Sequence, residues 1–321
     1  MGNKFLVLLT VSTLTWLVGF GYENANAAPP KYPTKAINLN VPWNPGGGAD
    51  LAARAIAGIA KKYLGQSLIV VQKPGAAGVT AHAEIGRMKK DGYNLIITGN
   101  SSVTVAPYLG KVNYDPLNDF EFIIRITNLR NCFAVVADSP FKTIKDVIAY
   151  AKANPGKVKI GTSGAYGVGD LTVRMLNRIA SIETVQVPFQ SAGEVVVAVM
   201  GGHVALSSGS ITSVAPAVRN KNLKILAITA DEREPSFPDI RTLKELGIDV
   251  GLNNQIGIGA SSGTPKAILD FLHSAFKQSM EDPGFKSMAQ KFEFSVDYLN
   301  GPDFRRSIIA DSEQVKAILA K

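Results

Sequence analysis

Short apolar segments alternate with amphipathic helical segments from about residue 36 to residue 230. The candidate strands read AINLNV, SLIVVQ, YNLIIT, FAVVAD, VKIGT, TVQVPF, HVALSS and LKILAIT. Nearly continuous apolar strands that alternate with helices are typical of parallel sheets covered on both faces. Eight such strands would crowd one small domain, so the pattern predicts an α/β protein with two lobes.

The first residues follow a different pattern. Lys4 precedes FLVLL and a broken apolar run that extends to Phe20, and ANA occupies Ala25 to Ala27. A basic start, a short apolar core and a small-x-small site predict a secretory signal peptide over residues 1–27, cleaved after Ala27 or Ala28. A retained membrane anchor is the alternative, but the run is shorter than the ~20 residues that a span needs. A lipid anchor is not expected, because no cysteine lies at the cleavage site.

Charge and cysteine content exclude several classes of protein. Lys and Arg total 34 against 26 Asp and Glu, a net charge of +8, but they occur singly or in pairs without interleaved aromatics. This pattern favours a small anionic ligand over nucleic acid. The lone Cys132 excludes an internal disulfide and is expected to be a buried structural thiol. Three scattered histidines make a metal site improbable, and His82 and His203 are expected at the surface or at helix caps.

A glycine loop precedes the first predicted helix, in the stretch VPWNPGGGAD. The first amides of a helix have no intrahelical partner and carry partial positive charge, and glycines let an anion approach them closely. A nucleotide-binding loop would place Lys and Ser or Thr directly after the last glycine, whereas this chain has Ala49 and Asp50. Taken alone, the loop is also compatible with a plain tight turn, with Asp50 as a helix cap.

Similar loops follow other strands. QKPGAAG and IGTSGAYGVGD are rich in glycine, and Asn100, Ser101 and Ser102 follow the strand IITG. Ligands of parallel α/β sheets bind outside the carboxyl ends of the strands. These loops therefore predict a cleft that binds a small anion through neutral donors.

An enzymatic interpretation is weaker. GASSG at residues 259–263 matches the G-x-S-x-G spelling of a hydrolase nucleophile, which would be Ser261. The only downstream histidine is His273, which lies three residues after Asp270 on the following predicted helix. A helix rises ~1.5 Å per residue and carries this histidine away from the serine. Asp50, Asp170 and Glu194 have no partners and are more simply helix-start carboxylates, so no catalytic residue is predicted.

A set of motifs resembles one family. VPWNPGGGAD, QKPGAAG, KKDGYNLI, YDPLNDF, ANPGKVKIGTSG, VPFQSAGEVVVAVMGGHV, LKILAITADERE and GTPKAIL follow one another from about Tyr32 to the C-terminus. In order and spacing they are similar to the Bug-type receptors, the periplasmic solute-binding proteins of tripartite tricarboxylate transporters.

The resemblance implies a two-lobed periplasmic-binding fold of the type II, flytrap kind, with a mostly parallel sheet in each lobe. Lobe 1 is expected at residues 28–127 and 231–321, and lobe 2 at residues 128–230. The implied function is capture of a small organic carboxylate in the periplasm by a monomer that delivers it to a membrane permease. Neither catalysis nor a cofactor is implied. A receptor that signals to another protein, or that takes an amino-acid-type ligand, is the alternative.

By position, the resemblance implies the following ligand-binding residues: Trp43, Asn44, Gly46, Gly47, Gly48, Ser101, Ser102, Ser163, Gly164, Tyr166, Gly167, Val168, Asp170, Phe189, Ser208 and Ser210. Backbone amides and hydroxyls are expected to hold the carboxylate, with Trp43, Tyr166 and Phe189 as apolar walls or, alternatively, as core residues.

The chain departs from the family pattern at several of its loops. The loop at Gly167, Val168 and Asp170 lacks the usual small hydroxyl residues and histidine, Ser207-Ser208-Gly209 lacks an aspartate, and Gln255 replaces an aromatic residue. These departures concern the distal part of the ligand rather than its carboxylate. Asp170 is expected to cap its helix or, alternatively, to bind an amino group.

Overall fold

The computed structural model describes residues 32–252 and 254–320, and the predicted signal peptide at residues 1–27 lies outside them. From Pro33 onward the chain forms one compact unit. Its strands are β1 (Ile37–Val41), β2 (Leu68–Gln72), β3 (Asn94–Gly99), β4 (Phe120–Asn128), β5 (Asn131–Val136), β6 (Lys159–Thr162), β7 (Val185–Pro188), β8 (Leu206–Ser210), β9 (Leu223–Ile228), β10 (Gln255–Ser261) and β11 (Leu299–Asn300).

Its α-helices are α1 (Gly48–Leu64), α2 (Val79–Ile85), α3 (Ala106–Leu109), α4 (Ile144–Ala153), α5 (Val168–Ala180), α6 (Ala192–Met200), α7 (Ile211–Arg219), α8 (Lys266–Glu281), α9 (Pro283–Lys291) and α10 (Gly301–Ala320). Short turns of other helix types are η1 (Ala76–Gly78), η2 (Ser101–Val105) and η3 (Lys244–Leu246). Across the described ranges, none of these helices combines the length and the apolar character that a membrane crossing requires.

The strands form two mixed sheets. The first has the order β11-β4-β10-β3-β1-β2 and the second the order β7-β6-β8-β5-β9. β10 runs antiparallel to β3 and β4, and β5 runs antiparallel to β8 and β9, because each of these strands enters its sheet from the opposite lobe. The strands around them, β1 to β4 and β6 to β9, share one direction within their sheets. The predicted two-lobed α/β fold is confirmed, and we call the parts built on the two sheets lobe 1 and lobe 2.

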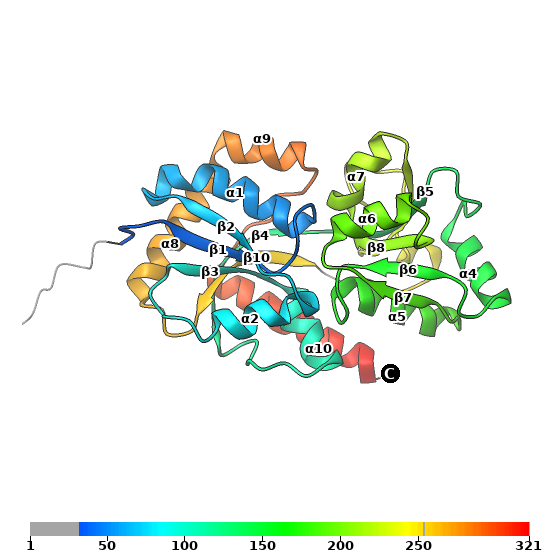
Figure 1. Cartoon of the computed structure of the whole chain (residues 1–321), viewed down its shortest axis with the longest axis horizontal. Coiled ribbons are helices and arrows are strands. Elements are labelled where there is room, and N and C mark those ends of the chain that lie inside the picture. Colours follow the sequence, from blue (N-terminus) through cyan, green and yellow to red (C-terminus); the bar gives the residue numbers. More distant parts are fainter. Residues whose placement is uncertain (1–31, 253, 321) are drawn as a thin grey trace, which may run out of the picture. The chain divides into compact units, whose positions relative to one another are not determined.

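Helices cover both faces of each sheet (Figure 1). In lobe 1, α1 packs with α8 and α9 on one side, and α2 and α10 lie on the other. In lobe 2, α6 and α7 bury one apolar cluster together with Cys132, which confirms that this thiol is buried. α4 and α5 bury a second cluster on the opposite face.

Two segments connect the sheets and run side by side. The first is residues 129–130, between β4 and β5, and the second leads into β10 and includes Asn254. We call them the connecting segments. The chain leaves lobe 1 between β4 and β5, where the Leu129 amide donates to the Asn254 carbonyl at 3.0 Å. It returns into β10, and the Asn254 amide donates to Asn128 Oδ1 at 3.2 Å. Before this return, Leu243, Ile248 and Leu252 pack in the apolar cluster of α4 and α5. The limits of the lobes along the chain stay a prediction.

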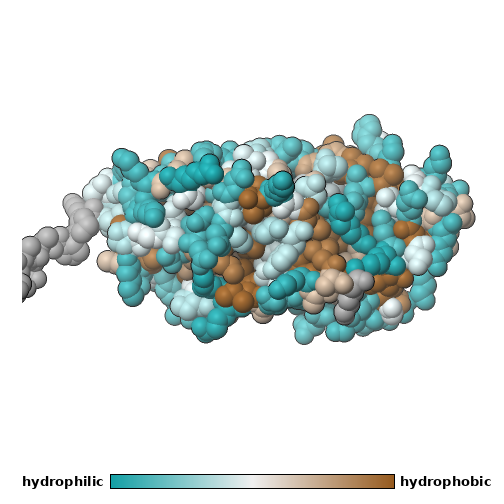
Figure 2. All heavy atoms as spheres, turned by 90° about the horizontal axis from the view of Figure 1, so that it is seen from below, coloured by the Kyte–Doolittle hydropathy of each residue, from teal (hydrophilic) through white to brown (hydrophobic). Residues whose placement is uncertain are grey.

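The C-terminal helix α10 contacts the cores of both lobes. Phe304 packs edge-on against Phe122 of β4, with ring centroids 5.2 Å apart. Further along the same helix, Val315 lies in the apolar cluster of lobe 2. On the face shown in Figure 2, hydrophilic side chains surround several apolar patches.

His82 is completely buried, so its predicted place at the surface or at a cap is wrong. The residue faces the sheet from α2, where its Nδ1 donates to the Gly78 carbonyl at 2.9 Å. Its Nε2 lies 3.2 Å from the hydroxyl oxygens of Thr98 and Ser102. Because burial penalises the charged imidazolium, the pKa of His82 is lowered to about 4. The alternation of small and polar residues in α2 gives no sign of this polar pocket.

Candidate functional site

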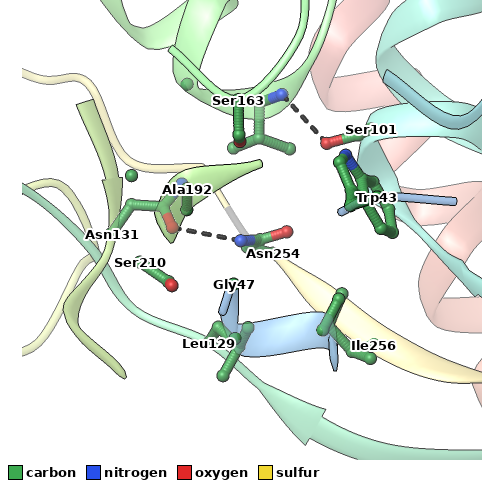
Figure 3. A pocket seen from close by; sticks show the side chains of 15 residues that line it. Trp43, Gly47, Ser101, Leu129, Asn131, Ser163, Ala192, Ser210, Asn254 and Ile256 are labelled. Carbon is green, nitrogen blue, oxygen red and sulfur yellow. Dashed lines mark hydrogen bonds between the residues drawn. The ribbon is translucent and has the colours of Figure 1, made fainter. Parts of the chain in front are cut away.

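A small cavity lies between the two lobes, at the carboxyl ends of their parallel strands (Figure 3). Its lining comes from both lobes and from the connecting segments: Trp43, Gly47, Gly48, Ala49, Ser101, Leu129, Asn131, Ser163, Val168, Gly169, Ala192, Gly209, Ser210, Asn254 and Ile256. The volume that the centre of a water molecule can reach within it is about 40 Å³. The cavity therefore suits a compact ligand.

The first helix start on the cavity wall belongs to α1. Gly46 has a left-handed backbone with φ of 94°, which glycine adopts without strain, and Gly47 is the N-cap. The Gly46 amide donates to Asp50 Oδ2 at 3.1 Å, and Arg54 pairs with the same oxygen at 2.9 Å. Asp50 thus holds the loop on the side away from the cavity, and Gly47, Gly48 and Ala49 line the cavity.

The second helix start, at α5, repeats this arrangement in lobe 2. Tyr166 has φ of 67°, Gly167 is the N-cap, and the Tyr166 amide donates to Asp170 Oδ2 at 3.0 Å. Arg174 pairs with that oxygen at 3.0 Å, as Arg54 does in lobe 1. The stretches GGADLAAR and GVGDLTVR encode this repeated helix start. Two helix N-termini with the same construction therefore flank one cavity.

Each helix start contacts a serine of the opposite lobe. The Gly48 amide, the first of α1, donates to Ser213 Oγ of α7 at 3.2 Å. The Val168 amide, the first of α5, donates to Ser101 Oγ after β3 at 3.2 Å (Figure 3). Helix-start amides lack intrahelical partners, so each of these bonds satisfies an otherwise open donor. They also show that both helix starts can donate to an oxygen presented from the opposite lobe.

Further contacts join the lobes at the rim. Asn44 Nδ2 donates to Glu194 Oε1 at 2.6 Å, and the Asn44 amide donates to the Gln190 carbonyl at 3.2 Å. Ser191 Oγ donates to the Pro45 carbonyl at 3.4 Å. Asn44 therefore holds the first loop of lobe 1 against the start of α6.

Side chains of the connecting segments form another wall of the cavity. Asn254 Nδ2 donates to Asn131 Oδ1 at 3.0 Å, and Leu129 and Ile256 supply apolar surface beside this pair (Figure 3). None of these residues was predicted from the sequence, and neither were Ala49, Gly169, Ala192 and Gly209 of the same lining.

The structure brings a first group of the predicted site residues to the cavity lining: Trp43, Gly47, Gly48, Ser101, Ser163, Val168 and Ser210. The other predicted residues lie outside that lining: Asn44, Gly46, Ser102, Gly164, Tyr166, Gly167, Asp170, Phe189 and Ser208.

Most of the second group have identifiable structural contacts instead. Ser102 is buried beside His82, and Ser208 Oγ donates to the Gly169 carbonyl at 3.0 Å. The Tyr166 ring covers Gly110. Phe189 lines a separate surface hollow with Pro45. Gly46, Gly167 and Asp170 build the helix starts without facing the cavity.

The electrostatics of the cavity come from main-chain groups. Among the described residues that line it, every side chain is uncharged. Asp50 and Asp170 are both 2% exposed and turn toward the loop amides and arginines behind the helix starts. A bound anion would therefore meet positive helix ends without a cationic side chain, and a bound cation would meet no carboxylate in the lining.

The residues of the hydrolase-like motif, Ser261, His273 and Asp270, are not arranged as a catalytic triad. Ser261 is 2% exposed, and its hydroxyl donates to the Ile85 carbonyl at 2.7 Å. His273 instead contacts the Tyr298 hydroxyl at 3.0 Å, and Asp270 pairs with Lys266. In the parts of the chain that the structure describes, no group of three His, Cys, Asp or Glu residues is placed to hold a metal ion.

Comparisons with known proteins agree with this architecture. The model of one protein family, described as "Tripartite tricarboxylate transporter family receptor", matches residues 52–321. The "UPF0065 protein in gbd 5'region" of Cupriavidus necator is 33% identical over 319 residues, covering 99% of this chain and 97% of that protein. Protein BugT of Bordetella pertussis is 26% identical over 316 residues, covering 95% and 96%. A solved structure titled "Structure of a periplasmic transporter" is 28% identical with a TM-score of 0.86, covering 90% of this chain and 98% of that one.

Proposed function

The chain belongs to the family of tripartite tricarboxylate transporter receptors, and from this membership we propose that it captures a small organic carboxylate between its lobes. The family consists of solute-binding receptors, not enzymes. We further propose that the chain acts in the periplasm as a monomer, after removal of its signal peptide, and delivers its ligand to the membrane subunits of such a transporter.

One observation carries the proposal of a carboxylate: two helix N-termini built on the same plan face one uncharged cavity. Main-chain amides at a helix start favour an anionic oxygen, and bonds to a charged acceptor are stronger than neutral ones. Ser101 and Ser213 already place oxygens 3.2 Å from the Val168 and Gly48 amides, so an oxygen is sterically accepted at both helix starts.

Binding and closure are linked in this proposal. The cavity lining comes from both lobes, so a ligand completes its contacts only when the lobes meet. A ligand shifts such an equilibrium by its differential contacts with the closed form. Excluding water then strengthens each bond to the carboxylate.

Ligand screening tests the proposal directly. The full chain is screened by thermal unfolding against mono-, di- and tricarboxylates, aromatic carboxylates and amino acids, because a ligand specific for the native state raises the melting temperature. Calorimetry then compares the wild type with Ser163→Ala and Gly47→Val, using Ser274→Ala and Gly58→Ala on α8 and α1 as controls. We expect weaker binding in the first two variants only. Absence of binding by any acid would reject the proposed function.

The cellular role has its own test. In a strain deleted for the gene, we expect uptake of the identified acid to be lost and to return when the gene is restored. Normal uptake together with a lost transcriptional response to the acid would instead identify a signalling receptor.

A further inference from the structure

The two connecting segments place an amide pair on the cavity wall. Asn131 begins β5 and is 2% exposed, and Asn254 directly precedes β10. Asn254 Nδ2 donates to Asn131 Oδ1 at 3.0 Å, and both residues line the cavity. Their backbones are fixed independently of the cavity, since Thr229 donates to the Asn131 carbonyl at 2.8 Å and Asn254 donates to Asn128 Oδ1 at 3.2 Å. Hydrogen bonds outside the cavity therefore hold the backbone of both residues in place.

One bond does not satisfy two carboxamides. Each side chain carries an NH2 donor and a carbonyl acceptor. With Asn254 Nδ2 bonded to Asn131 Oδ1, the Asn131 NH2 and the Asn254 Oδ1 make no side-chain hydrogen bond to another residue that the structure describes. Exchanging O and N in both amides leads to the same result, because one donor and one acceptor are again left over. Either way, one donor and one acceptor remain for the contents of the cavity, and one of the two belongs to the nearly buried Asn131.

A hydroxyl group complements this pair because it both donates and accepts. A C–H at the same place would leave both amide groups desolvated without partners, which costs more than the bonds themselves contribute. An ammonium group has only hydrogen-bond donors and a full charge, and no carboxylate lines the cavity among the described residues. Asp170 cannot compensate that charge from its position behind α5, where it pairs with Arg174.

We propose that Asn131 and Asn254 bind a hydroxyl group of the ligand, so that the receptor selects 2-hydroxycarboxylates over the corresponding unsubstituted acids and amino acids. The hydroxyl is assigned to the carbon next to the carboxylate, because the amide pair lines the same cavity as both helix starts. This inference rests on the proposed function, since the helix starts hold the carboxylate to which the hydroxyl is adjacent.

Matched acids that differ at one carbon test this selection. Calorimetry on the full chain compares lactate, propionate and alanine, then malate, succinate and aspartate, then 2-hydroxyglutarate, glutarate and glutamate. At the chain length that binds best, we expect the hydroxy acid to bind at least ~10-fold more tightly than the unsubstituted acid, and the amino acid to bind more weakly than both. Equal affinity of hydroxy and unsubstituted acids would overturn this inference and leave the proposed function standing. Absence of binding throughout would overturn both.

Variants assign the selection to the pair. Asn131→Leu and Asn254→Leu keep the branched shape of the side chain and remove the amide, so we expect the preference for the hydroxy acid over the unsubstituted acid to fall below ~3-fold. Asn94→Leu is the matched control, because Asn94 belongs to another amide pair, with Asn38 at 3.3 Å, that does not line the cavity. Asn254→Ala serves if a leucine variant fails to fold. A preference that persists in every folded variant of the pair would contradict the assignment.

Discussion

Asp50 and Asp170 make the same contacts in two different lobes. Each accepts a hydrogen bond from the amide four positions before it, at 3.1 and 3.0 Å, and each pairs with an arginine four positions after it, at 2.9 and 3.0 Å. Both carboxylates lie behind a glycine N-cap whose helix start faces the cavity. Their positions assign them to shaping the loops rather than to touching the ligand.

Asp170→Asn separates these two roles. The variant keeps an acceptor for the Tyr166 amide but loses the charge at the helix N-terminus and the pair with Arg174, so we expect the free energy of unfolding to fall by about 1 kcal/mol. Relative affinities for carboxylates and amino acids should stay unchanged. Urea unfolding and calorimetry measure the two effects, with Asp270→Asn as an exposed control. A selective loss of amino-acid binding would instead identify Asp170 as a ligand contact.

Gly48→Ala should obstruct the approach of the lobes. A Cβ at this position would lie 2.7 Å from Leu129 Cδ1 and 2.9 Å from Ser210 Oγ, closer than real contacts allow. We expect the affinity for the cognate acid to fall ~10-fold or more, with little loss of stability when no ligand is present. Gly58→Ala in the same helix meets only the end of the Met288 side chain, 3.4 Å away. Binding by that control should match the wild type, and equal binding by both variants would be evidence against the closure argument.

Asn44→Ala removes contacts between the lobes without changing the cavity lining. The lost bond from Asn44 Nδ2 to the Glu194 carboxylate, at 2.6 Å, favours the form in which the lobes meet. A hydrogen bond to a charged group contributes about 1.5–3 kcal/mol, so we expect ligand affinity to fall ~10-fold through the closure equilibrium. Calorimetry gives the affinity, and small-angle scattering should show a larger radius of gyration for the ligand-free variant. An unchanged affinity would remove Asn44 from the closure mechanism.

His82 should make stability depend on pH in a defined window. Its pKa is lowered from 6.5 to about 4 by burial, so the unfolded chain binds a proton that the folded chain excludes. The contribution of His82 to the free energy of unfolding is complete above pH 6.5 and is lost as pH falls toward 4. At pH 5 the free energy of unfolding should be lower by about 2 kcal/mol. Urea unfolding between pH 7 and pH 5 measures the slope, which should be absent in His82→Gln and retained in His203→Gln. An equal slope in His82→Gln would assign the effect to other groups.

The sequence predicted the loops that carry main-chain donors, because glycine patterns before helices have a local physical cause. Trp43, Gly47, Ser163 and Val168 lie where such loops meet the cavity. The sequence did not indicate which of the neighbouring residues Ser101 and Ser102 would line the cavity. In the structure Ser101 lines it, and Ser102 is buried against His82.

The connecting segments were missed because their role depends on long-range pairing. The sequence around Asn131 and Asn254 is unremarkable, and the pairing of β4 with β10, extended by the bond between Leu129 and Asn254, brings the two residues together. The repeated helix start had a readable signal in the shared G-x-x-D-L-x-x-R spelling at Gly47 and Gly167. Few identities outside that stretch support it, so it does not stand out as an internal repeat.

Because the helix start is repeated, a difference between the two ends of the cavity must come from other residues. A ligand with the same chemical group at both ends would meet the same helix-start geometry at α1 and at α5. The repeated part of the structure therefore does not distinguish one end of such a ligand from the other. That equivalence is broken at Trp43 and Ser163, which lie four positions before their respective N-cap glycines and both face the cavity. An indole lies before one helix start and a hydroxymethyl group before the other, so the two ends of the cavity differ in size and in polarity.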